Sequence, residues 1–133
     1  AIKTKRPDLP IYAVEPAGFD DTKRSLETGA RQSVVPGAKS FCDALLSPMP
    51  GEITFSLNSR LLTGAFAVTD SEVSAAMRAV FTDLKLVSEP GGTVAMAAIL
   101  AGKLAMQGKT VAAIISGGNV DPDLYADILT GNR

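Results

Sequence analysis

Short apolar runs alternate along the chain with longer stretches in which apolar and polar residues are interleaved. The runs are bounded by residues typical of turns and have the length of β-strands. They are Ile11–Val14, Ala65–Val68 and Val111–Ile115. The last run is uninterrupted, which is typical of a strand covered on both faces in a parallel sheet.

The interleaved stretches have the periodicity of helices, and two of them carry end signals. Gly29 follows the first as a helix-ending residue, and Thr69 with Glu72 forms a capping-box sequence at the start of the third. The predicted helices are Asp20–Thr28, Glu52–Leu62, Ser71–Lys85, Gly91–Gln107 and Asp121–Leu129.

Two stretches are less regular. Arg31–Gly51 is rich in Pro and Gly, and we expect a long loop with a helical turn or two near Phe41–Leu46. Glu52–Leu62 also fits a strand, because alternate residues from Ile53 are apolar, although we favour a helix. Gly91–Gln107 opens with a run of mostly small apolar residues, which predicts a helix buried on several sides. The order of elements predicts an α/β fold, with a layered, mostly parallel sheet flanked by helices.

Composition narrows the possible functions. The 133 residues suit one core, and 46% hydrophobic with 20% charged residues is typical of a globular protein. The net charge is -1, and no block of like charge suggests a nucleic acid or a membrane surface as a partner. The absence of histidine excludes every histidine-based catalytic pair or metal site in this chain. The single Cys42 excludes an internal disulfide, and we expect a cytoplasmic protein.

Two glycine-containing motifs are candidate ligand loops. Ser116-Gly117-Gly118-Asn119 directly follows the most apolar predicted strand, where ligands bind in open α/β sheets. Glu89-Pro90-Gly91-Gly92 precedes the predicted buried helix. Each motif is also compatible with a simple connection, the first as a tight turn and the second as a helix start with proline in its first position.

A third motif, Glu15-Pro16-Ala17-Gly18-Phe19-Asp20-Asp21, follows the first predicted strand. Two carboxylates six residues apart on a turn can hold a hard cation together with a backbone carbonyl and waters. Acidic residues also favour a helix N-terminus, which explains Asp20 and Asp21 without a metal but leaves Glu15 unexplained.

These three motifs, in this order, resemble the C-terminal part of the serine/threonine dehydratase and serine racemase family. Its members are fold-type-II pyridoxal-phosphate enzymes, related in fold to the tryptophan synthase β-subunit. The resemblance extends from about Ile11 to Asp121, and Ser116–Asp121 is its most specific part. It implies that this chain is the C-terminal portion of the large, cofactor-binding domain.

The resemblance implies pyridoxal 5'-phosphate as the cofactor, with Ser116 hydrogen-bonded to the pyridine nitrogen and with Gly117 and Glu89 beside it. It also implies a Mg²⁺ or Ca²⁺ site formed by Glu15, the carbonyl of Phe19 and Asp21. The substrate would be threonine or serine, with 3-hydroxyaspartate the next candidate. The product would be a keto acid and ammonia.

The family's Schiff-base lysine motif and its glycine-rich phosphate loop are absent from this sequence. We therefore expect this segment alone to be inactive, and we expect its partners to be the N-terminal part of the same enzyme and, in a homodimer, a second copy. Serine racemase stays a possible activity within the family. A non-catalytic α/β binding or regulatory module is the alternative from another class.

Overall fold

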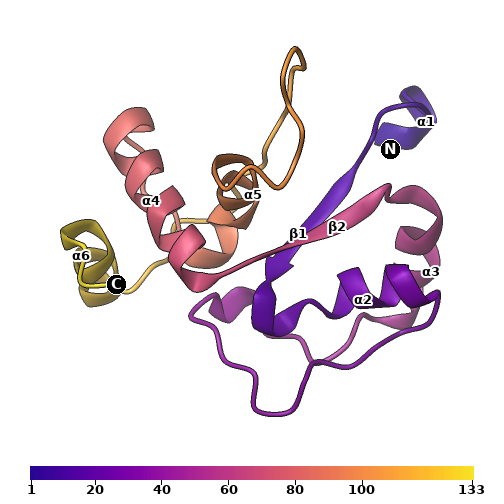
Figure 1. Cartoon of the computed structure of the whole chain (residues 1–133), viewed down its shortest axis with the longest axis horizontal. Helices are drawn as coiled ribbons and strands as arrows, with labels where there is room; N and C mark the ends of the chain where they lie inside the picture. Colours follow the sequence, from indigo (N-terminus) through magenta and orange to yellow (C-terminus); the bar gives the residue numbers. More distant parts are fainter.

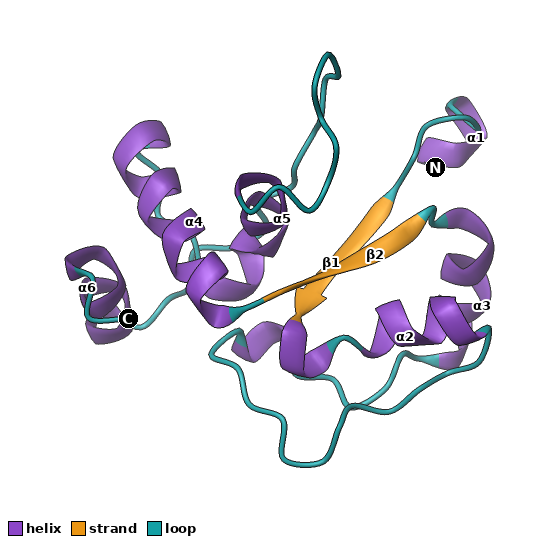
Figure 2. Ribbon diagram, viewed as in Figure 1, coloured by secondary structure: helices purple, strands orange, loops and turns teal.

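Two parallel strands form the centre of the molecule. The computed structural model describes all 133 residues. Strand β1 (Tyr12–Pro16) pairs with β2 (Gly64–Val68), with Tyr12 opposite Gly64 and Pro16 opposite Val68. Parallel strands need a connection that crosses back over the sheet, and the segment between them supplies it with two helices and a long loop (Figure 2).

The helices surround this pair of strands. They are α1 (Ile2–Lys5), α2 (Asp21–Thr28), α3 (Glu52–Leu61), α4 (Asp70–Leu84), α5 (Pro90–Leu100) and α6 (Pro122–Thr130), with short 3-10 turns η1 (Ala17–Phe19) and η2 (Asp43–Leu45). Figure 1 shows α2 on one side of the strands and α5 on the other, with α4 and α6 beyond α5. This arrangement confirms the predicted layered α/β fold with a parallel sheet.

The core lies where α4 and α5 meet the carboxyl end of β2. Val73, Ala76, Met77 and Val80 of α4 are fully buried at helical spacing, which agrees with the helix predicted over Ser71–Lys85, whereas Leu84 at its end is 51% exposed. The nine residues of the core cluster are Cys42, Val68, Val73, Ala76, Met77, Val94, Ala97, Ala98 and Ile128. The capping box is formed: Thr69 Oγ1 accepts from Glu72 N, and Glu72 Oε2 accepts from Thr69 N.

Several local predictions agree with the structure. Gly29 ends α2 in the left-handed conformation at φ 73°. The segment Glu52–Leu61 is a helix rather than the alternative strand. The Pro- and Gly-rich stretch before it is a loop that contains only η2. No helix is both long and apolar enough to cross a membrane.

The prediction of a buried strand at Val111–Ile115 is wrong in this structure. The segment belongs to no helix or sheet, and Ile114 is 75% exposed. A strand exists only where a neighbour pairs with its backbone groups, and the sheet of this chain contains β1 and β2 alone. The apolar composition of the segment is real, but no pairing neighbour lies beside it.

Helix α5 is shorter than the predicted Gly91–Gln107. It ends at Leu100, because Gly102 adopts φ 68° and the amide groups of Gly102 and Lys103 bond back to the carbonyls of Ile99 and Ala98. These two bonds form a Schellman motif, which ends a helix. The prediction of burial holds for the first turns, where Pro90–Val94 are all buried, whereas Leu100 is 54% exposed.

Candidate cofactor and metal sites

The structure brings Glu89 and Gly117 into direct contact. Glu89 is the residue that precedes α5, and its backbone N donates to the Gly117 carbonyl oxygen at 2.9 Å. Its carboxylate accepts a hydrogen bond from Asn119 N at 3.1 Å. Glu89 therefore holds the Ser116–Asn119 loop at two points, one on the backbone and one on the side chain.

Two glycines allow this contact. A Cβ atom on Gly117 would lie 2.5 Å from Cδ and Oε1 of Glu89, and one on Gly92 would lie 2.8 Å from the backbone N of Gly117. Both distances are far below normal van der Waals separation. The N-terminal turn of α5 and the Ser116 loop thus approach each other so closely that neither glycine can carry a side chain without movement.

A buried hydroxyl pair fixes the start of α5. Ser88 and Thr93 are both fully buried, and Thr93 Oγ1 lies 2.8 Å from Ser88 Oγ and 2.7 Å from the Glu89 carbonyl oxygen. Sequence reasoning missed these two residues. The signal available was a hydroxyl residue directly before the motif and another directly after it, flanking a proline at the first helical position.

Ser116 lies beside this clamp and is exposed. Its hydroxyl makes no hydrogen bond within the chain, so it is free to donate to a ligand or accept from one. The close approach of Gly92 and Gly117 and the free hydroxyl of Ser116 fit the ring-nitrogen side of a pyridoxal-phosphate site. This chain offers neither a glycine-rich loop for the phosphate nor the family's Schiff-base lysine motif.

Glu15 and Asp21 line one cavity of about 250 Å³ between the end of β1, η2 and α3. Glu15, in β1, accepts hydrogen bonds from the backbone N atoms of Thr22 and Lys23 at 3.0 and 2.9 Å. Asp21 is 4% exposed. Phe19, in η1, is not among the residues that line this cavity.

Burial raises the pKa of both carboxyls above their ordinary values. In Glu15, hydrogen bonds from Thr22 and Lys23 partly counteract this rise in pKa. In Asp21, a backbone hydrogen bond and the positive charge of Arg24 do so. Nowhere in the chain do three or more acidic or cysteine side chains converge as a metal-binding group. A cation here would therefore have two carboxylates, backbone carbonyl oxygen and water as its ligands, a set of hard donors suited to Mg²⁺ or Ca²⁺.

A family model described as "Pyridoxal-phosphate dependent enzyme" matches residues 1–117. The chain belongs to that family. It is 37% identical over 130 residues to a serine racemase of Dictyostelium discoideum and 33% identical over 129 residues to an L-threonine ammonia-lyase of Thermotoga maritima. Those alignments cover 96% and 97% of this chain but only 40% and 32% of the two relatives.

Solved structures agree. A threonine deaminase from T.th. superposes with a TM-score of 0.83 at 33% identity, over 91% of this chain and 43% of that one. The Dictyostelium serine racemase superposes with a TM-score of 0.77 at 36% identity, over 90% of this chain and 38% of that one. The chain thus has the fold of part of a fold-type-II pyridoxal-phosphate enzyme. It spans between 32% and 43% of the length of the relatives named above.

Proposed function

We propose that this chain is the C-terminal portion of the cofactor-binding domain of a dehydratase. The enzyme would convert a β-hydroxy amino acid to a keto acid and ammonia. Relatives named L-threonine ammonia-lyase, phenylserine dehydratase and L-threo-3-hydroxyaspartate ammonia-lyase support this reaction class. Threonine and serine are the leading substrates, and 3-hydroxyaspartate follows them.

The observation that carries the proposal is the Glu89 clamp on the Ser116 loop. When bound, pyridoxal phosphate supplies the electron sink that makes the Cα proton of an amino acid acidic. The Ser116 hydroxyl would donate a hydrogen bond to the pyridine nitrogen without transferring its proton. A hydroxyl partner leaves that nitrogen a weaker electron sink than an aspartate partner would, which suits elimination.

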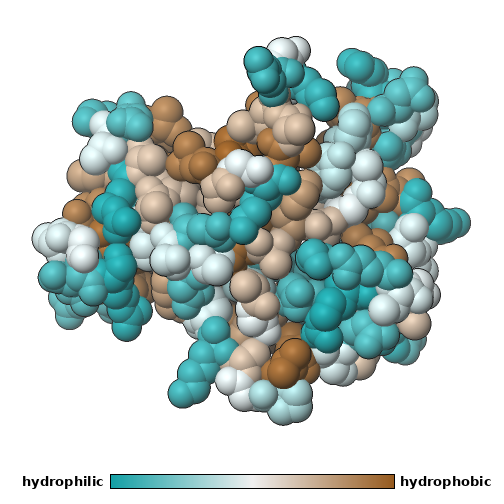
Figure 3. Space-filling view, viewed as in Figure 1, coloured by the Kyte–Doolittle hydropathy of each residue, from teal (hydrophilic) through white to brown (hydrophobic).

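The remaining parts of the active site would come from the N-terminal part of the same enzyme. A lysine there would form the covalent link and move the Cα proton, and a glycine-rich loop would hold the phosphate. Apolar surface supports such a partner: Leu86, Val87 and Ile114 are exposed close in sequence to Glu89 and Ser116. Figure 3 also shows apolar surface over the region of α4 and α5.

Substitution of Ser116 tests the proposal in the complete enzyme. Ser116→Ala leaves the ring nitrogen unpaired, a cost of about 1 to 3 kcal/mol, so cofactor affinity should fall about ten- to a hundredfold. Ser116→Asp should favour a protonated ring and move the products from elimination toward racemisation or transamination. Ser59→Ala, at an exposed serine of α3, is the control and should change neither property.

Two results would reject or revise the proposal. If cofactor dissociation and product ratio are unchanged in both Ser116 variants, Ser116 only shapes a turn and does not contact the cofactor. A complete protein without cofactor absorbance would favour a non-catalytic binding module. Serine racemase is the second candidate activity, favoured by the 37% identity to the Dictyostelium enzyme. Assay of D-serine against keto acid, with L-serine as substrate, separates these two activities.

We further propose that Glu15 and Asp21 bind Mg²⁺ or Ca²⁺ in a structural or regulatory role. The carbonyl of Phe19, which the family resemblance adds as a ligand, does not line their shared cavity. The half-buried Glu15 and the buried Asp21 line one cavity, and a cation between them would offset the cost of removing their charges from water. Mg²⁺ should raise the melting temperature of the complete enzyme, and Asp21→Asn should abolish that rise. Asp20→Asn is the matched control, because Asp20 pairs with Arg24 and does not line the cavity. If Mg²⁺ still raises the melting temperature of the Asp21→Asn variant, the proposed metal site is wrong.

A further inference from the structure

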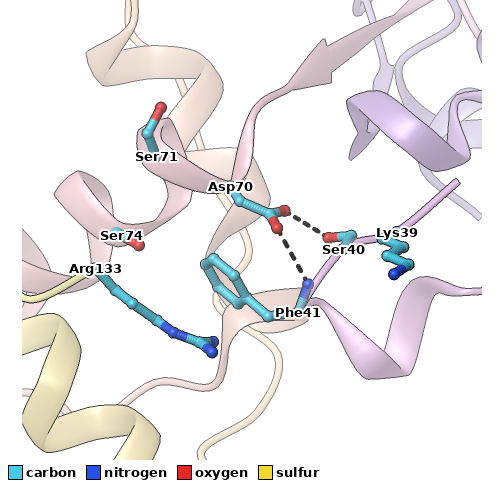
Figure 4. Close-up of a pocket in the computed structure, with 7 residues that line it drawn as sticks. All are labelled: Lys39, Ser40, Phe41, Asp70, Ser71, Ser74 and Arg133. Carbon is cyan, nitrogen blue, oxygen red and sulfur yellow. Dashed lines mark hydrogen bonds between the residues drawn. The ribbon is translucent and has the colours of Figure 1, made fainter.

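A second cavity, of about 440 Å³, lies at the N-terminus of α4, away from both candidate sites (Figure 4). Its seven lining residues are Lys39, Ser40, Phe41, Asp70, Ser71, Ser74 and Arg133, and all of them except Phe41 are polar or charged. None of these residues belongs to the Ser116 loop, the Glu89 motif or the carboxylate pair at the end of β1.

One buried polar group in this cavity has no partner. Ser74 is 1% exposed, and its hydroxyl makes no hydrogen bond within the chain although it lines the cavity. Figure 4 shows the Ser74 oxygen on the side of the helix that faces Phe41. The Ser74 hydroxyl opens onto the cavity and is not sealed from it, so it can donate to or accept from a ligand atom that enters there.

Asp70 is held in place but retains the capacity to bind. Its two carboxylate oxygens accept from Ser40 Oγ at 2.6 Å and from Phe41 N at 3.3 Å. Each oxygen of an ionised carboxylate can accept about two hydrogen bonds, so one position on each stays available. The carboxylate therefore presents a fixed negative charge on one side of the cavity.

Two positively charged side chains, Lys39 and Arg133, also line the cavity. The four ion pairs of the chain involve neither Lys39 nor Arg133. Arg78 donates to the carbonyl oxygen of Arg133 at 3.0 Å, which ties this residue to α4. In Figure 4 the Arg133 side chain ends beside the Phe41 ring, on the opposite side from Asp70. The N-terminus of α4 adds the positive end of a 15-residue helix.

We propose that this cavity binds a free acidic α-amino acid at a site separate from the cofactor. The α-ammonium would donate to Asp70, and the two carboxylates would meet Arg133, Lys39 and the Ser74 hydroxyl. The Phe41 ring would contact the methylene carbons. A simple anion would leave Asp70 repelling it, and a neutral amino acid would leave one cation unmatched. The lining side chains carry two positive charges and one negative charge, which an acidic amino acid complements in sign and number.

Three probes of similar size test the charge requirement by calorimetric titration of the complete protein. L-aspartate carries one ammonium and two carboxylates, L-asparagine lacks the second carboxylate, and succinate lacks the ammonium. We expect L-aspartate to bind at least tenfold more tightly than either of the others. Equal binding of succinate would indicate an anion site and would overturn the proposal.

Variants then locate the binding. Asp70→Asn and Lys39→Gln should each weaken L-aspartate at least fivefold, while Ser116→Ala should leave this titration unchanged because Ser116 lies outside the cavity. Lys39→Gln keeps the test valid if Asp70→Asn disturbs the Ser40 contact, because the Lys39 side chain makes no hydrogen bond in the chain. Binding lost in Ser116→Ala but kept in Lys39→Gln and Asp70→Asn would assign the ligand to the cofactor site instead.

Discussion

Gly92→Ala tests the close approach on which the candidate cofactor site depends. Helix propensity alone predicts that this change stabilises α5 by about 1 kcal/mol, because alanine is the better helix former. The structure predicts the opposite. A Cβ atom at Gly92 would lie 2.8 Å from the backbone N of Gly117 and 3.0 Å from its carbonyl oxygen. Backbone atoms cannot rotate away as a side chain can, so the Ser116 loop has to move.

The magnitude follows from two costs and one gain. Forcing an extra methyl group into a packed contact costs about 1 to 3 kcal/mol. Moving Gly117 also weakens the 2.9 Å hydrogen bond from Glu89 N, worth about 1 kcal/mol. Subtracting the helix-propensity gain of about 1 kcal/mol leaves a net loss of about 1 to 3 kcal/mol. Cofactor affinity should fall as well, because Ser116 moves with the loop.

Urea unfolding and cofactor dissociation measure the two effects. Gly64→Ala is the control, because a Cβ there meets only ring carbons of Tyr12 at 3.8 Å, an ordinary contact. We expect its stability to stay within about 0.5 kcal/mol of the unmodified protein. If Gly92→Ala is as stable as the unmodified protein and binds cofactor equally well, the contact between α5 and Gly117 does not exist as described.

Local chemistry underlies three further predictions. Thr69→Ala removes the capping-box acceptor and should cost about 1 kcal/mol in urea unfolding, whereas Thr82→Ala, which removes only exposed hydrogen bonds within the body of α4, should cost less. Burial raises the pKa of Cys42 to about 11, so in the folded protein at pH 8 this thiol should react with a disulfide reagent far more slowly than after unfolding; equal rates would contradict its burial. Burial raises the pKa of Glu15, and protonation of this carboxyl removes the charge that would bind Mg²⁺, so stabilisation by Mg²⁺ should decrease as pH falls from neutral toward the ordinary carboxyl range. If stabilisation by Mg²⁺ does not depend on pH, Glu15 is not a ligand of the metal.

Local signals predicted the elements that depend on local contacts. The capping box joins residues three apart, Thr69 and Glu72, and both bonds are present. Gly29 ends α2 as its position predicts. Gly102 carries the same signal for the end of α5, but the long apolar run outweighed it and the predicted helix continued to Gln107.

Val111–Ile115 could not be settled from composition. An uninterrupted apolar run indicates that a segment favours burial, but it does not show which strand would pair with it. In this structure no strand lies beside it, so its side chains stay partly exposed. The position of Ser116 is nonetheless defined, because Glu89 fixes the loop that follows. The sequence pattern identified both Glu89 and Ser116, but only the three-dimensional structure shows that one holds the loop of the other.

The Glu15 carboxylate accepts two backbone hydrogen bonds, and these allow it both to start a helix and to bind a metal. The carboxylate accepts from Thr22 N and Lys23 N, so it covers free amide groups in the first turn of α2 from outside the helix. In the sequence, helix-start chemistry and metal binding are alternative explanations of the motif, and helix-start chemistry leaves Glu15 unexplained. Each of its oxygens uses one acceptor position for an amide, which leaves further positions directed elsewhere. The two roles are therefore compatible: the amides fix the orientation of the carboxylate, and a fixed carboxylate loses less entropy when it binds a cation.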